Sequence, residues 1–161
     1  MIPARPHSWL IISASFAAAL AITLFPVPVL LAPLRPDWTT LVLIYWIIAL
    51  PHRVGVGTGW VVGMFQDAAT GTLLGQQALG MTVVAYLVLL LYQRIRNYPV
   101  WQQAIIVMIF IALFRVIGAW VLGVIGRPVG FSYWLPALTS MLVWPLVFLV
   151  LRHIRRRYHV V

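Results

Sequence analysis

Few side chains in this sequence could take part in chemistry, and the most unusual is a carboxylate inside an apolar segment. The chain has two acidic residues, Asp37 and Asp67, with eleven Arg, four His and no Cys. Asp67 lies in the apolar run from Val54 to Ala69, where a lone carboxylate is costly and needs a partner or a proton. Arg115 lies in the middle of a later apolar run and has the same difficulty. We therefore expect Asp67 and Arg115 to form a buried polar pair.

The sequence leaves other interpretations of Asp67 open. Gln66, Gln76 and Gln77 are alternative hydrogen-bonding partners, because they are its neighbours in the chain or across the next connection. A ligand or proton site is a second interpretation of this carboxylate. Extension of Asp67 or Arg115 toward the membrane interface is a third.

The sequence lacks the motifs of the common enzyme classes. It has no Gly-rich loop ending in Lys-Ser or Lys-Thr, no Gly-x-Ser-x-Gly elbow and no His-Glu-x-x-His helix. The two carboxylates are predicted at different depths, and the four His lie near predicted membrane edges, which disfavours a metal cage. The absence of Cys excludes disulfides and thiol catalysis. We expect no catalytic residue, no cofactor and no metal site.

Small residues recur at every fourth position in the segment that carries Asp67. Gly55, Gly59, Gly63 and Asp67 share one face of a helix at this spacing. Such glycines let another helix approach closely, which favours helix association in lipid. The approaching helix belongs either to this chain or to a partner that docks on this face, and the spacing does not separate the two.

The composition indicates that a membrane surrounds the elements that position these residues. Of the 161 residues, 63% are hydrophobic and 8% are charged, whereas a soluble domain has roughly 25% charged residues. Six apolar runs predict an all-α integral membrane protein with about six transmembrane helices in one polytopic domain, residues 1–161. The runs are Trp9–Leu24, Trp38–Leu50, Val54–Ala69, Gln76–Tyr92, Trp101–Val124 and Tyr133–Leu151.

The second and third runs are short for a membrane crossing. At about 1.5 Å per residue they extend about 20 to 24 Å, whereas the hydrocarbon core is about 30 Å thick. They would tilt little and thin the bilayer, or form a hairpin that does not cross completely.

The distribution of arginine predicts the orientation, because positively charged loops stay in the cytoplasm. With the N-terminus inside, only Arg35 and Arg127 of the arginines between the helices and at the chain ends lie outside. The opposite orientation would place the other arginines of these segments outside instead. We therefore expect both termini in the cytoplasm. No arginine stripe accompanies exposed aromatic residues, so nucleic acid is not an expected partner, whereas the basic C-terminal tail suits membrane lipids. The arginines on the cytoplasmic side are Arg5, Arg53, Arg94, Arg96, Arg152, Arg155, Arg156 and Arg157.

Four stretches of the chain together resemble the proteobacterial MreD family. The resemblance extends in unbroken order from about Arg35 to the C-terminus. Its most specific parts are the Arg-Pro-Asp-Trp segment at residues 35–38 and ALPHRVGVGT at residues 49–58. The apolar segment LVLIYWII (41–48) lies between them. The other parts are Asp67 with Gly71 and LGQQAL (74–79), YQRIRNYPVWQQA (92–104) and PALTSMLVWPLVFLVLRHIRRR (136–157).

The resemblance implies a function and a fold. MreD proteins are inner-membrane components of the rod complex, or elongasome, and act with MreC, MreB, RodA and a class-B penicillin-binding transpeptidase. They organise lateral peptidoglycan synthesis, and no catalytic activity is ascribed to them. Their fold is similar to the six-helix substrate-binding subunits of energy-coupling-factor transporters. We therefore expect a scaffold of the bacterial inner membrane that maintains rod shape by binding MreC and other members of the complex.

Two groups of residues are candidates for partner binding, namely the glycine face with Asp67 and the cytoplasmic loop from Gln93 to Gln103. An alternative function is the binding of a small molecule or a lipid-linked precursor, as in transporter subunits, although few polar residues are available to line a pocket. A membrane enzyme is disfavoured because acids and nucleophiles are missing. The candidate partner-binding residues are Gly55, Gly59, Gly63, Asp67, Arg94, Arg96, Trp101 and Gln102.

Overall fold

The computed structural model describes residues 6–161, which form six α-helices and two short 3₁₀ turns. The helices are α1 (Pro6–Leu24), α2 (Trp38–Ala49), α3 (Val56–Thr70), α4 (Gln76–Arg96), α5 (Val100–Val124) and α6 (Leu135–Arg157), and the turns are η1 (Ala32–Leu34) and η2 (Phe131–Trp134). Each predicted run corresponds to one helix. α4 and α6 continue through their terminal arginines, because arginine is a good helix former and cations are favoured at helix C-termini. The all-α prediction is therefore confirmed for the described residues, and Arg5 lies outside them.

Four of the helices are long and apolar enough to cross a membrane. They are α1, α4, α5 and α6, with candidate spans of 18 to 27 residues. α2 and α3 have 12 and 15 residues, which correspond to about 18 and 23 Å, less than the hydrocarbon thickness of about 30 Å. The prediction of two short helices among six is confirmed, and the chain has the build of a multi-pass membrane protein.

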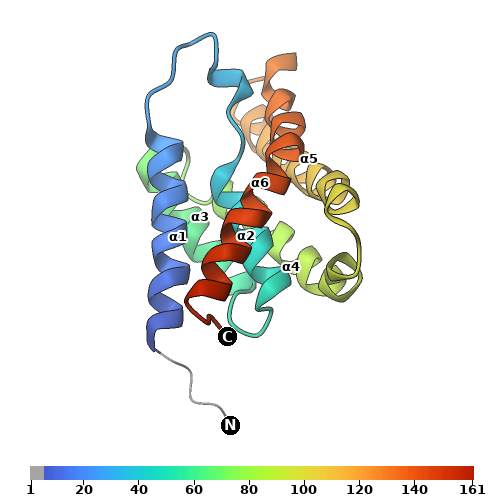
Figure 1. Cartoon of the computed structure of the whole chain (residues 1–161). Helices are drawn as coiled ribbons and strands as arrows, with labels where there is room; N and C mark the ends of the chain where they lie inside the picture. The colour runs from blue at the N-terminus through green and yellow to red at the C-terminus, as the bar shows by residue number, and fades with distance from the viewer. Residues whose placement is uncertain (1–5) are drawn as a thin grey trace.

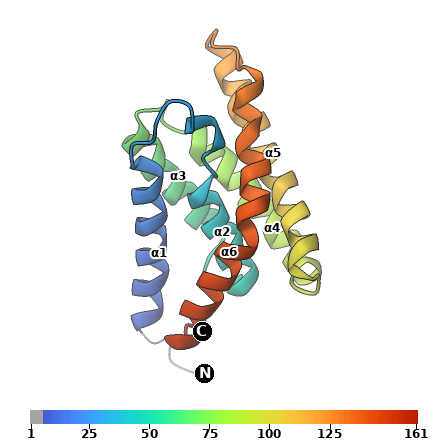
Figure 2. The same ribbon diagram turned by 45° about the horizontal axis from the view of Figure 1, so that its top comes forward.

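The helices form a bundle in which the start of α1 and the C-terminus lie at the same end (Figure 1). We call this the terminal end, and it also contains residues 50–55 and 97–99. The loop end is the opposite one, formed by residues 25–37, 71–75 and 125–134. α3 and α4 pack closely against each other, and α2 lies among α1, α4 and α6, an arrangement also visible in the turned view of Figure 2.

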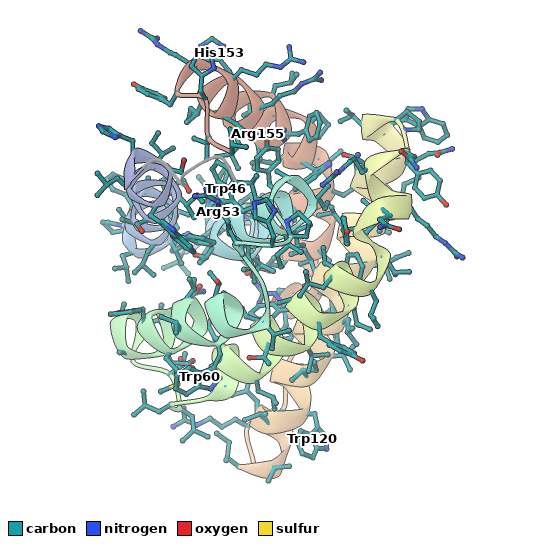
Figure 3. All side chains as sticks on the ribbon, turned by 90° about the horizontal axis from the view of Figure 1, so that it is seen from below. Trp46, Arg53, Trp60, Trp120, His153 and Arg155 are labelled. Carbon is teal, nitrogen blue, oxygen red and sulfur yellow. The ribbon has the colours of Figure 1, made fainter. Side chains whose placement is uncertain are left out.

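α2 is the centre of the bundle. All ten residues from Thr39 to Ile48 are buried, so this helix presents no face to lipid. A helix that is apolar on every side is stable only when neighbours surround it, and α1, α4 and α6 do so. Trp46 is its largest fully buried side chain and lies in the middle of the bundle in Figure 3.

Polar contacts join α2 to each of the helices that surround it. The Nε1 of Trp46 donates to the Oγ of Ser15 in α1 at 2.8 Å. Arg96 of α4 donates from Nη2 and Nε to the carbonyl of Ile48, at 2.5 and 3.2 Å, and so satisfies one of the free carbonyls at the end of α2. At the other end, the Oγ of Ser140 in α6 accepts the backbone N–H that precedes α2, at 3.1 Å.

The glycine face of α3 packs against α4 of the same chain. A Cβ added at Gly63 would lie 2.7 Å from the backbone nitrogen of Ala78, and one at Gly59 would lie 3.0 Å from the carbonyl oxygen of Met81. The close approach expected from the spacing is therefore internal packing. The docking interpretation of Gly55, Gly59 and Gly63 is corrected accordingly, because α4 covers this face and leaves no room for a second helix.

Large apolar side chains cover much of the outer surface. Trp60 of α3 is 52% exposed and Trp120 of α5 is 66% exposed, and Trp120 lies at the edge of the bundle in Figure 3. Tryptophan in such positions is favoured at membrane–water interfaces, because its ring is apolar and its N–H is polar. The surface of the bundle is therefore suited to lipid contact.

Replacement of Gly63 by Ala tests the close approach of α3 and α4. The added methyl group would meet the backbone of Ala78, and we expect overpacking to lower stability by about 1–3 kcal/mol. Thermal unfolding of the purified protein in detergent, followed by tryptophan fluorescence, measures this loss. Gly57→Ala is the matched control, since a Cβ there meets no atom within 4 Å. Equal melting temperatures for Gly63→Ala and the parent would contradict the packing.

Candidate functional site

A polar pocket of about 780 Å³ lies at the loop end of the bundle. Its walls come from the last turns of α1 and α3, from the second half of α5, from the starts of α4 and α6 and from the connecting segments. This volume is within the range of small-ligand sites, about 300–1,000 Å³. The polar residues that line the pocket are Thr23, Arg35, Asp37, Gln66, Thr70, Thr72, Gln76, Gln77, Arg115, Arg127 and Tyr133.

A salt bridge between Arg115 and Asp37 forms one wall of the pocket. The Nε and Nη2 of Arg115 donate to the two carboxylate oxygens of Asp37 at 3.0 and 2.7 Å. This two-bond geometry is among the strongest that an arginine makes with a carboxylate. It connects α5 to the N-terminal end of α2. The expected pair of Asp67 with Arg115 is thereby corrected, because the guanidinium of Arg115 is directed to Asp37.

The surroundings of Asp37 make its charge dependent on Arg115. Burial raises the pKa of the Asp37 carboxyl above its ordinary value, whereas the charge and hydrogen bonds of Arg115 act to lower it. The two side chains are only 13% and 18% exposed. Removal of the guanidinium would therefore leave a carboxyl group that favours its protonated form.

Asp67 is fully buried and is satisfied without an arginine. Its Oδ1 accepts the hydroxyl of Thr72 at 2.7 Å and the N–H of Gln77 at 3.0 Å. Its Oδ2 accepts the N–H groups of Gly75 at 2.9 Å and Ala78 at 3.3 Å. These backbone donors belong to the start of α4, where free N–H groups and a partial positive charge favour a carboxylate. Asp67 therefore fixes the connection between α3 and α4.

Two glycines allow this connection to fold back. Gly71 ends α3 with φ of +70°, and Gly75 precedes α4 with φ of +98°. Glycine adopts this left-handed backbone region without the steric cost that other residues incur. The conformation of Gly75 lets its N–H reach Asp67.

An aromatic ring closes the wall beside the salt bridge. The Cζ of Arg115 lies 4.9 Å from the centre of the Tyr133 ring, which is a favourable cation–π distance. The hydroxyl of Tyr133 lies against Gly118 of α5, where a Cβ would collide with it. The absence of a side chain at Gly118 therefore lets Tyr133 approach α5 and hold the guanidinium in place.

The remaining candidate partner-binding residues lie at the terminal end, around the connection between α4 and α5. Arg94 is exposed, Trp101 is 64% exposed and Gln102 is partly buried. The guanidinium of Arg96 donates to Ile48 of α2 and so has a structural role. Arg96 is also exposed, so Arg94 and Trp101 are the exposed members of this group without a structural contact to α2.

The composition of the pocket suits binding rather than catalysis. Its lining supplies amides, hydroxyls and guanidinium groups but no nucleophile beside a base. The lining contains three arginines and one carboxylate, that of Asp37. Arg35 donates to two backbone carbonyls at the end of α1, and Arg115 is paired, so Arg127 has no carboxylate partner within residues 6–161. Across the same residues, no cluster of His, Asp and Glu could hold a metal ion.

Sequence reasoning identified the two buried charges in need of partners but missed the role of Asp37. The sequence does contain a signal, because Asp37 immediately precedes an apolar run and Asp is favoured directly before a helix. The sequence did not indicate that Asp37 lies inside the bundle. α2 has only 12 residues, and its N-terminal end lies inside the bundle against α5 and α6 rather than at the surface.

Comparisons with known proteins point to one family. The chain matches the family described as rod shape-determining protein MreD over residues 5–154. A curated rod shape-determining protein MreD from Haemophilus influenzae is 34% identical over 152 residues, which cover 92% of this chain and 93% of that protein. No solved structure matches the chain.

A double-mutant cycle tests the salt bridge. Arg115→Gln leaves a buried carboxyl without its cation, and we expect a loss of unfolding free energy on the order of 3 kcal/mol. Asp37→Asn is expected to be destabilising as well, while the double variant should lose less than the sum of the two. Denaturation of the purified protein in detergent measures all three. Strictly additive losses would show that the two side chains do not interact.

Replacement of Asp67 by Asn tests the closure of the α3–α4 connection. The amide nitrogen cannot accept the N–H groups at the start of α4, so we expect a loss of about 1–3 kcal/mol in unfolding free energy. Thr72→Val removes one donor and leaves the carboxylate in place, so its effect should be smaller. Hydrogen exchange at the start of α4 should also accelerate in Asp67→Asn. Unchanged exchange there would argue against this role of the carboxylate.

Proposed function

The chain belongs to the MreD family of rod shape-determining proteins, and on that premise we propose that it is a non-catalytic scaffold of the rod complex in the bacterial inner membrane. The family determines cell shape and is not a family of enzymes. The scaffold organises lateral peptidoglycan synthesis by holding other membrane proteins together. The match across nearly the whole chain is the observation that carries this proposal.

The proposed direct partner is MreC, with MreB, RodA and a class-B penicillin-binding transpeptidase as further members of the assembly. A scaffold needs a rigid body that presents accessible side chains. The polar contacts around α2 support rigidity, and the exposed Arg94 and Trp101 support a contact site at the terminal end. Aromatic residues and arginine are the side chains most often found at the centres of protein interfaces.

The proposed orientation has both termini in the cytoplasm and the loop end outside. Most arginines in the described part of the chain belong to the terminal end, whereas Arg35 and Arg127 belong to the loop end, which supports the orientation because positive charge is retained inside. Residues 1–161 then form one polytopic domain. The six helices, two of them short, also support the proposed likeness to the substrate-binding subunits of energy-coupling-factor transporters.

The second candidate function is the binding of a small molecule or a lipid-linked precursor. The pocket of about 780 Å³ at the loop end is the observation that favours it. Both functions can belong to one chain, since the pocket and the proposed partner-binding residues lie at opposite ends of the bundle.

A complementation experiment tests the scaffold and its contact site together. The chain is expressed in cells of its own species depleted of the chromosomal copy, and cell width and the recovery of MreC after cross-linking are measured. The parent chain should restore rods. Trp101→Ala should reduce MreC recovery several-fold and widen the cells at unchanged membrane abundance, because it removes an exposed anchor.

Trp120→Ala is the matched control for this experiment. Trp101 and Trp120 belong to the same helix and are 64% and 66% exposed, but Trp120 lies toward the loop end. The control variant should behave as the parent chain does. Equal MreC recovery from both variants would overturn the contact site, and failure of the parent chain to restore rods or to recover MreC would overturn the scaffold.

A further inference from the structure

We propose that the polar pocket at the loop end binds the glycerol phosphate headgroup of an anionic phospholipid. The ligand chemistry is a phosphate ester that carries free hydroxyl groups. The inference stands apart from the scaffold role, because it concerns the opposite end of the bundle and can be tested on the purified protein.

The charges around the pocket favour an anion. Of the three arginines in its lining, Arg115 is engaged by Asp37 and Arg35 by backbone carbonyls. Arg127, exposed in the segment between α5 and α6, has no carboxylate partner among residues 6–161. A phosphate oxygen is a suitable acceptor for its guanidinium. The lining thus carries three cations and one carboxylate.

The start of α4 is not the anion site. A helix N-terminus ordinarily attracts phosphate through its free N–H groups, but Asp67 already accepts those of Gln77 and Ala78. The negative charge of Asp67 is compensated there, whereas Arg127 belongs to the segment between α5 and α6. The phosphate is therefore expected on the Arg127 side.

The neutral lining suits hydroxyl groups. Gln66 lines the pocket and is 6% exposed, and its Oε1 accepts no hydrogen bond from the described part of the chain. Such an unsatisfied oxygen is costly unless a donor reaches it or the amide turns. Gln76 and Gln77 contribute further side-chain amides to the lining. Amides of this kind donate to and accept from a diol, whereas a trimethylammonium group offers them no hydrogen bond.

An apolar pocket beside the polar one indicates that the ligand is a lipid. It has a volume of about 600 Å³ and shares Arg35 and Pro36 with the polar pocket. The rest of its lining, including Phe25, Leu31 and Trp38, is apolar. An amphipathic ligand would place its headgroup in the first pocket and the start of an acyl chain in the second, whereas a soluble ester would use only the first.

Native mass spectrometry of the full chain in detergent tests the site. The delipidated protein is offered equal amounts of phosphatidylglycerol and phosphatidylcholine with identical acyl chains, and retention is measured for the parent, Arg127→Gln, Gln66→Leu and the control Arg94→Gln. The parent should retain phosphatidylglycerol in preference. Arg127→Gln should weaken its retention by roughly tenfold, as expected for the loss of one charge-assisted contact. Gln66→Leu should reduce the preference over phosphatidylcholine.

The control separates the site from general attraction between the basic protein and an anionic lipid. Arg94 is an exposed arginine at the terminal end, so Arg94→Gln should retain the lipid as the parent does. Equal retention of the two lipids, or an equal loss in Arg94→Gln and Arg127→Gln, would overturn the proposal. Thermal unfolding without lipid identifies any folding defect of Gln66→Leu. If that variant is defective, lipid retention by Arg127→Gln alone tests the site, because Arg127 lies in an exposed segment.

Free glycerol 3-phosphate separates a lipid from a soluble ligand. If it displaces phosphatidylglycerol only in large excess, the site takes the lipid, as proposed. If it raises the melting temperature of the delipidated protein as much as the lipid does, and Arg127→Gln removes this effect, the soluble ester is the ligand and the lipid assignment is overturned. No displacement and no stabilisation by the ester, together with equal lipid retention, would remove the site altogether.

Discussion

The complete burial of α2 is the constraint on which the rest of the structure depends. A helix with ten consecutive buried residues cannot exist at the edge of a bundle, so α1, α4 and α6 must surround it. Its length of 12 residues also places both of its ends within reach of side chains from neighbouring helices. The unpaired backbone groups at those ends then require partners, and the chain supplies them from α4 and α6.

Three charged side chains act at helix ends in this way. Arg96 and Arg115 act at opposite ends of α2, and Asp67 acts at the start of α4. Each of these three charges has a defined hydrogen-bonding partner. Hydrogen-bonded charges of this kind contribute specificity of packing, because a shift of one helix along another would leave them unpaired.

The sequence predicts the elements of this fold better than their partners. Apolar runs and turn residues located all six helices, and the spacing of Gly59 and Gly63 predicted a close helix contact. The glycine spacing could not show whether the contacting helix is α4 or a helix of another protein, because the packing geometry is the same in both cases. The sequence also did not predict which residue pairs with Arg115. The depth of each charged residue in the membrane was inferred from its position relative to an apolar run. Because α2 is short, Asp37 lies inside the bundle although it precedes such a run. The pocket is formed by segments that are distant in the sequence, so no local sequence pattern predicts it.

Polar contacts attach both ends of α2 to neighbouring helices, one at the loop end and one at the terminal end. Arg115 and Asp37 belong both to the pocket lining and to the attachment of α2 at the loop end, while Arg96 attaches α2 at the terminal end, two residues from the exposed Arg94. A bound anion that competed with Asp37 for Arg115 would weaken one attachment and leave the other in place. The 12 residues of α2 correspond to about 18 Å, so the two attachments lie a short distance apart along one helix. A physical connection of this kind becomes regulation only where the ligand favours one of two arrangements of α2.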